Sequence, residues 1–201
     1  MNKGGVPLSF EKELKKRHLL FLDLETSGLT NDCVIYTIGY SFGLEGDIIV
    51  GHSFEISDPV EAEKNTLEKF IREIEGKKLI FVTYCGYVFD MRLLLFKSIK
   101  YNMNSYVFVD DPDHNWHLDL VFLWEKMRIG RTGKRFSDMA KFLGILHEDK
   151  YAGGLVPHFY RKGEYDKIID HQRKDIELLK KVYVKLDSLT EYMLKRRYGG
   201  S

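Results

Sequence analysis

The chain has 201 residues, of which 44% are hydrophobic and 30% are charged. This composition excludes a disordered chain and a small disulfide-stapled protein, and it predicts a globular protein with a sizeable core. Lysine and arginine number 31 against 30 acidic residues, a net charge of +1, so any nucleic-acid partner requires basic residues that are gathered on one face.

The first predicted elements are strands. Residues 18–24, HLLFLDL, form a short apolar run that ends before Thr26 and Gly28, which is typical of a buried strand. Residues 34–42 and 47–54 are rich in β-branched and aromatic residues, and Gly-Leu-Glu-Gly connects them, as in a hairpin. We therefore expect three antiparallel neighbours.

Helical spacing dominates the rest of the chain. Leu67, Phe70 and Ile74 recur at helical spacing and predict an amphipathic helix that closes at Gly76. The expected elements from here on are a helix over 60–74, a strand over 78–83, a helix from Asp90, a strand over 106–109, helices over 117–127 and 136–143, and a long or broken helix over 165–195. Together they predict an α/β fold, a mixed five-stranded sheet with helices on both faces.

Cysteine usage and hydropathy indicate the compartment. Cys33 and Cys85 lie far apart and form no metal-ligand pattern, so we expect reduced thiols in an intracellular, cytoplasmic protein. No apolar run approaches the roughly 18–20 residues of a membrane span, so we expect no membrane partner. We expect residues 1–17 to be an N-terminal lead-in, residues 18–196 a single domain and residues 197–201 a flexible tail.

Asp23 and Glu25 stand at the end of the first predicted strand. Because residues two apart in a strand share a face, both carboxylates point away from Leu22 and Leu24. Like charges placed so close repel, and Mg²⁺ or Mn²⁺, which prefer oxygen ligands, are the simplest counter-charges. The other interpretation is that one carboxylate caps the turn at 26–28 and the other is solvated.

Three more residues extend this pattern. Asp90 follows the fourth predicted strand, at a position that also suits a helix N-cap. His171 and Asp175 are four residues apart in the C-terminal helix and therefore share a face, although alone they would read as a solvated stripe. Together with Asp23 and Glu25 they predict an acidic metal site.

These residues lie in three segments, FLDLETSGL at 21–29, YCGYVFD at 84–90 and HQRKD at 171–175. The segments resemble, in order and spacing, the three motifs of the DEDD, or DnaQ-like, 3′–5′ exonucleases of the ribonuclease-H-like fold. The resemblance extends from about residue 18 to residue 185. It implies a ribonuclease-H-like three-layer fold.

The resemblance also implies roles for individual residues. Asp23, Glu25, Asp90 and Asp175 would be the metal ligands, with His171 beside the reactive water. Two Mg²⁺ or Mn²⁺ ions roughly 3.5–4 Å apart can activate water and stabilise the leaving oxygen in phosphodiester hydrolysis. Asp23 would bridge both ions and Asp90 would act through water. His171, with an ordinary pKa of about 6.5, would take the proton.

The chain departs from the family at two positions. Three residues separate His171 from Asp175. This is the spacing of the family branch that carries tyrosine in place of His171, whereas the histidine branch usually has one more intervening residue. Cys85 stands where many members carry asparagine. We expect the first departure to affect the role of His171 and the second to remove a polar contact to substrate.

The candidate substrate contacts lie in a basic stretch and in the motifs. Residues 125–141, EKMRIGRTGKRFSDMAK, place Arg131, Lys134 and Arg135 beside two glycines, which suits a flexible loop that tracks phosphates. A solvated surface loop is the other interpretation. The candidates within the motifs are Thr26, Leu29, Tyr84 and Phe89, of which Leu29 and Phe89 would wedge or stack against terminal bases.

The function predicted from these residues and the resemblance is a metal-dependent 3′–5′ exonuclease that acts on nucleic acid, with single-stranded DNA favoured and RNA left open. Two alternatives remain on the same fold. One is an endonuclease that cuts a structured or hybrid substrate. The other is a nucleic-acid-binding module without turnover, against which the presence of all four acids argues.

Overall fold

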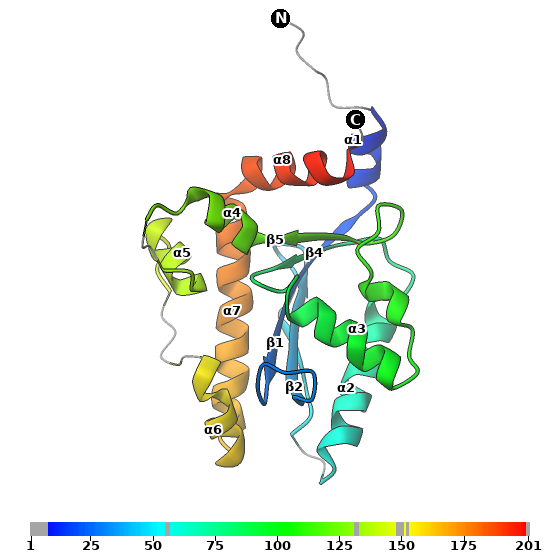
Figure 1. The fold of residues 1–201 in the computed structure, drawn as a ribbon, viewed down its shortest axis with the longest axis vertical. Helices are drawn as coiled ribbons and strands as arrows, with labels where there is room; N and C mark the ends of the chain where they lie inside the picture. Colours follow the sequence, from blue (N-terminus) through cyan, green and yellow to red (C-terminus); the bar gives the residue numbers. More distant parts are fainter. Residues whose placement is uncertain (1–7, 55–56, 131–132, 148–150, 152, 200–201) are drawn as a thin grey trace, which may run out of the picture.

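A computed structural model of the chain describes residues 8–54, 57–130, 133–147, 151 and 153–199. Its centre is a five-stranded sheet in the order β3-β2-β1-β4-β5 (Figure 1). The strands are β1 His18–Thr26, β2 Ile35–Phe42, β3 Ile49–His52, β4 Leu79–Thr83 and β5 Trp116–Asp119. β1, β2 and β3 are antiparallel neighbours, whereas β4 runs parallel to β1 and to β5. The predicted mixed sheet of five strands is confirmed.

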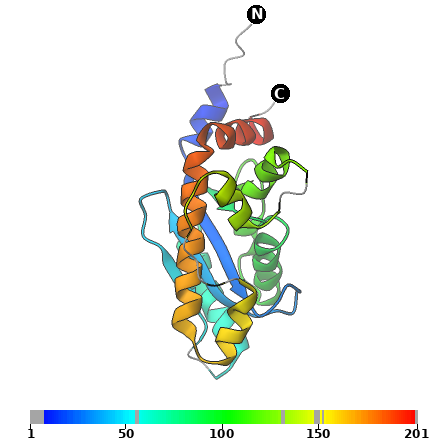
Figure 2. The same ribbon diagram turned by 90° about the vertical axis from the view of Figure 1, so that its left-hand side faces the viewer.

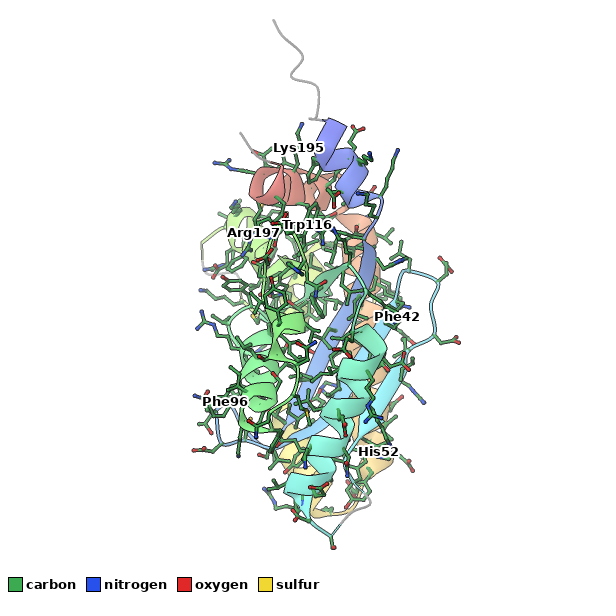
Figure 3. The ribbon with its side chains drawn as sticks, turned by 90° about the vertical axis from the view of Figure 1, so that its right-hand side faces the viewer. Phe42, His52, Phe96, Trp116, Lys195 and Arg197 are labelled. Atoms are coloured by element: carbon green, nitrogen blue, oxygen red, sulfur yellow. The ribbon has the colours of Figure 1, made fainter. Side chains whose placement is uncertain are left out.

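Helices cover both faces of this sheet. α2 Pro59–Ile74 and α3 Asp90–Lys100 lie on one face (Figure 3), and α7 Tyr165–Lys185 runs along the other (Figure 2). The remaining helices are α1 Leu8–Leu14, α4 Leu120–Met127, α5 Phe136–Phe142, α6 Val156–Arg161 and α8 Asp187–Tyr198. None of the helices in the described ranges is long and apolar enough to cross a membrane.

The alternation of β1 separates the two faces. Leu20, Leu22 and Leu24 are buried in the core cluster that includes side chains of α2 and α3. Phe21 packs into the opposite cluster, which α7 shares. Because side chains alternate along a strand, Asp23 and Glu25 follow Phe21 onto the face of α7.

The fifth strand is not where the sequence analysis placed it. The segment expected as a strand over 106–109 forms a 3₁₀ turn, Ser105–Phe108, whose Asn104 side chain accepts a hydrogen bond from the Tyr106 N–H. Its apolar pattern reflects the burial of Val107 and Phe108 rather than strand pairing. The observed fifth strand is β5, which occupies the start of the helix that was expected over 117–127.

That helix, α4, begins only at Leu120. The Asp119 carboxylate accepts a hydrogen bond from the Val121 N–H, so Asp119 is the N-cap, and the residues before it stay extended against β4. A strand of four residues, WHLD, is too short to show a period of two.

The C-terminal helical segment breaks at Leu186 into α7 and α8. α8 lies beside α1, beyond the N-terminal end of β1 (Figure 1). Trp116 is stacked between Phe10 and Tyr198, with ring centroids 5.6 and 4.5 Å away, and so ties both terminal helices to β5. This end of the molecule lies opposite the C-terminal end of β1, where the acidic residues are.

Candidate active site

Glu25, His171 and Asp175 come together between the end of β1 and α7. The His171 Nε2 atom lies 3.2 Å from Glu25 Oε1 and 3.6 Å from Asp175 Oδ2. One ligand atom from each of the three residues falls within 4.8 Å of the others, and within the described ranges no other such group of three is found. Glu25 and His171 are buried, and Asp175 is partly exposed. The end of β1 and the third motif therefore lie side by side, and their potential ligand atoms form a compact set.

The other two acids are Asp23 on β1, which is partly exposed, and Asp90, the buried first residue of α3. Burial raises the pKa of Asp23 to about 6, although the charge of His171 and a hydrogen bond from Gln172 act in the opposite direction. Burial also raises the pKa of Asp90 well above its ordinary value, and the negative charges of Asp23 and Asp119 raise it further. Such shifts mark an environment that favours either protons or cations.

These shifts predict a pH dependence for the metal-free protein. Asp23 keeps its proton up to about pH 6 in the folded state but only up to about 3.8 when unfolded. The stabilising contribution is therefore fully present below pH 3.8 and is lost as the pH rises to 6. The loss in the free energy of unfolding is about 3 kcal/mol, and Asp90 acts in the same direction. Urea unfolding in EDTA from pH 4 to 7 measures it.

The variant Asp23→Asn provides the control for this prediction. It keeps the shape of the side chain but removes the titrating group, so its free energy of unfolding should fall less than that of the parent over the same pH range. Parallel curves for the two proteins would contradict the assignment of the raised pKa to Asp23.

Asp119 forms hydrogen bonds with the loop that precedes Asp90 and so positions this acid. Asp119 accepts hydrogen bonds from the Cys85 N–H at 2.8 Å and from the Tyr87 N–H at 2.9 Å. The chain then enters α3, whose N-cap is Phe89 and whose first residue is the buried Asp90. The carboxylate of Asp119 therefore orders the segment that carries the acid of the second motif, although Asp119 lies outside all three motifs.

Cys85 adopts a left-handed backbone conformation in this loop, with φ of 62°. Asparagine tolerates this conformation better than most side chains, so Cys85→Asn should raise the free energy of unfolding by about 0.5 kcal/mol. Urea unfolding checks the value. Cys85→Val, with a β-branched side chain, should lower it, and equal stability of the two variants would contradict strain at this residue.

The substrate candidates of the motifs have different environments. The Thr26 hydroxyl donates to the backbone oxygen of Gly28 at 2.6 Å, so it is engaged within its own turn. Leu29 is 83% exposed just beyond β1. Phe89 is partly buried and packs on the core cluster under α2 and α3. Among Thr26, Leu29 and Phe89, Leu29 is thus the apolar side chain that is exposed to solvent and accessible to a substrate base.

The basic stretch is anchored to the end of β4. The Tyr84 hydroxyl donates to the backbone oxygen of Lys134 at 2.7 Å, and its ring stacks on Phe136. The Lys134 ammonium forms an ion pair with Glu125, and Arg135 is the exposed N-cap of α5. Arg131 lies outside the described residues. The part of the stretch at Lys134 and Phe136 therefore lies next to the end of the strand that leads to Asp90.

Three residues near the site were not anticipated. Gln172 donates from Nε2 to Asp23 Oδ2 at 2.5 Å. His147, from the segment after α5, places Nε2 3.9 Å from Asp175 Oδ1. A Cβ on Gly153 would lie 3.4 Å from His171 Nε2, so this glycine brings the backbone close to the imidazole. Only a fold brings such distant segments together, and no spacing in the sequence indicates them.

Comparison with known proteins identifies related folds. The model of the RNase H superfamily matches residues 20–187. E. coli exonuclease I in complex with a dT13 oligonucleotide has a TM-score of 0.62 at 14% identity, over 90% of this chain and 44% of that chain. The zinc-bound E. coli exonuclease I complex with single-stranded DNA gives 0.64 at 15% identity, over 90% and 43%.

A polymerase has the same fold in part. The family B DNA polymerase from the archaeon Pyrobaculum calidifontis has a TM-score of 0.71 at 13% identity, over 92% of this chain and 27% of that chain. The chain therefore spans less than half the length of these proteins. A search of curated protein sequences gave no significant match. At these identities the likeness is one of fold.

Proposed function

Because the chain belongs to the RNase H superfamily, we propose that it is a metal-dependent nuclease that removes nucleotides from the 3′ end of nucleic acid. The observation that carries the proposal is the convergence of Glu25, His171 and Asp175, together with the raised pKa of two further acids, Asp23 and Asp90. Single-stranded DNA is the favoured substrate, in line with the oligonucleotide complexes of E. coli exonuclease I.

The donor set suits hard divalent cations. Carboxylate oxygens of Glu25 and Asp175 within 4.8 Å of each other, with acids of raised pKa beside them, fit Mg²⁺ or Mn²⁺, and the family resemblance implies two ions. Glu25 and Asp175 would hold the ions together with Asp23, while Asp90 would act through water. Bound divalent ions supply an acidified water and neutralise charge on the phosphate.

His171 would accept the proton of the attacking water. The imidazole is held between Glu25 and Asp175, the carboxylates that would bind the ions. His171→Gln should therefore lower the single-turnover rate about a hundredfold. Its affinity for Mn²⁺, measured by calorimetry, should stay within about tenfold of the parent value. Recovery of the full rate at high Mn²⁺ would instead identify His171 as a metal ligand.

The side chains around the pocket suit a single strand. Leu29 is exposed beyond β1 for contact with a terminal base, and Tyr84 lies at the end of β4. Lys134 and Arg135, with Arg131 before them, would neutralise phosphates upstream of the scissile bond. Thr26 and Phe89 would support the turn and the loop that shape the pocket.

One experiment tests the proposed function. Single-stranded DNA, RNA and duplex DNA, each labelled at the 5′ end, are incubated with the protein in Mg²⁺, Mn²⁺ or EDTA. We expect a ladder that shortens from the 3′ end, faster on single-stranded DNA and absent in EDTA. Cleavage of a 3′-blocked strand would favour an endonuclease. Binding without any cleavage in either metal would favour a module without turnover.

A further inference from the structure

Gln172 is a fully buried polar residue between α7 and the sheet. Its side chain lies over Gly39 of β2, where a Cβ would stand 2.5 Å from Gln172 Cγ and 2.8 Å from Nε2. Only glycine leaves room for the amide at this point of the strand. Gly39 is the register partner of Asp23 in the β1–β2 pair. The amide therefore lies directly beside the first acid of the site.

Two hydrogen bonds hold this amide in place. The buried hydroxyl of Thr37 donates to Gln172 Oε1 at 2.6 Å on the side of β2. Gln172 Nε2 donates to Asp23 Oδ2 at 2.5 Å. A hydroxyl can donate or accept, so the carboxylate selects the orientation, because a reversed amide would bring an oxygen against it, and Thr37 anchors the other end of the amide.

The Asp23 carboxylate is thus held by Gln172 through Oδ2, and the Leu24 N–H also bonds to it. We infer that Gln172 is a positioning residue that fixes the orientation of the Asp23 carboxylate for binding divalent metal. The inference rests on the proposed function in that it assumes a divalent ion at Asp23.

Thr37 provides the decisive variant because its side-chain hydroxyl bonds to Gln172 rather than to one of the acids. Thr37→Val keeps the shape and removes the hydroxyl that anchors Gln172. We expect the affinity for Mn²⁺ to fall about tenfold in Gln172→Met, several-fold in Thr37→Val and little in Thr37→Ser, which keeps a hydroxyl. Isothermal titration of Mn²⁺ into each full-length protein, without nucleic acid, measures this order.

The matched control is Thr66→Val, which removes a buried hydroxyl that donates to the His52 backbone oxygen, away from Asp23. Its affinity for Mn²⁺ should equal that of the parent. Hydrolysis assays should show a lower kcat for Thr37→Val with an unchanged KM for the oligonucleotide. Urea unfolding confirms that each variant is folded, and should Gln172→Met not fold, the comparison of Thr37→Val with Thr66→Val decides.

The outcomes separate the inference from the proposed function. If the parent binds Mn²⁺ and cleaves DNA but Thr37→Val and Gln172→Met bind Mn²⁺ as tightly as Thr66→Val, the inference is wrong and the function stands. If the Mn²⁺ affinities of the parent and the variants follow the expected order but the parent cleaves no nucleic acid, the inference stands and the proposed function is wrong. A parent that binds no divalent ion overturns both.

Discussion

Asp175→Asn should lower the rate of hydrolysis about a thousandfold while the protein stays folded. The carboxylate contacts His171 at 3.6 Å and belongs to the set of three ligand atoms, so its loss removes a charged donor to the metal. A weakened metal site costs about 4 kcal/mol of transition-state stabilisation, which corresponds to this factor. The side chain is 24% exposed, so an amide of the same shape disturbs little packing.

The matched control for this prediction lies on the same helix. Glu177→Gln removes a carboxylate two residues further along α7, on its exposed side, and should leave the rate unchanged. Single-turnover digestion of a 5′-labelled strand in Mg²⁺ measures both variants. Digestion by Asp175→Asn at the rate of Glu177→Gln would remove Asp175 from the metal site.

The part of the site that could be predicted follows from local geometry. Alternation along a strand places Asp23 and Glu25 on one face, and the helical period places His171 and Asp175 on one face. Both rules act within a few residues, so they need no tertiary information. The resemblance to a family then supplied the pairing of the two segments, which the sequence pattern alone does not contain.

What could not be predicted depends on contacts between distant segments. In the sequence, Gln172 is one more polar residue in a charged helix. Its hydrogen bonds to Thr37 and Asp23 form only in the fold, where β2 lies beneath it. A glycine inside a strand often marks the close approach of another group, so Gly39 is the residue in the sequence that could have indicated this contact. β5 was missed because four residues carry too little pattern, and no local pattern marks Asp119 as the anchor of the Asp90 loop.

Lys97→Met should lower the free energy of unfolding by about 3–5 kcal/mol. Lys97 and Glu63 are each 1% exposed, and their charged groups lie 2.9 Å apart between α3 and α2. Glu63 also accepts hydrogen bonds from the Tyr101 hydroxyl and, at 2.7 Å, from the Ile35 N–H. Without the ammonium, the buried carboxylate of Glu63 loses its counter-charge.

The destabilisation should also reach the candidate site, because Ile35 pairs with Thr26 where the β1–β2 register shifts next to Glu25. Urea unfolding measures the stability, and Arg72→Met is the control, since Arg72 forms an exposed ion pair with Glu68 and should cost less than about 1 kcal/mol.

The double variant Glu63→Gln/Lys97→Met distinguishes an unpaired charge from lost packing. The glutamine can still accept the hydrogen bond from Ile35 but carries no charge, so the double variant should be more stable than Lys97→Met by roughly 1–3 kcal/mol. Additive losses in the double variant would mean that Lys97 contributes through the packing of its methylene chain. In that case the carboxylate of Glu63 would be stabilised by the Ile35 N–H and the Tyr101 hydroxyl alone.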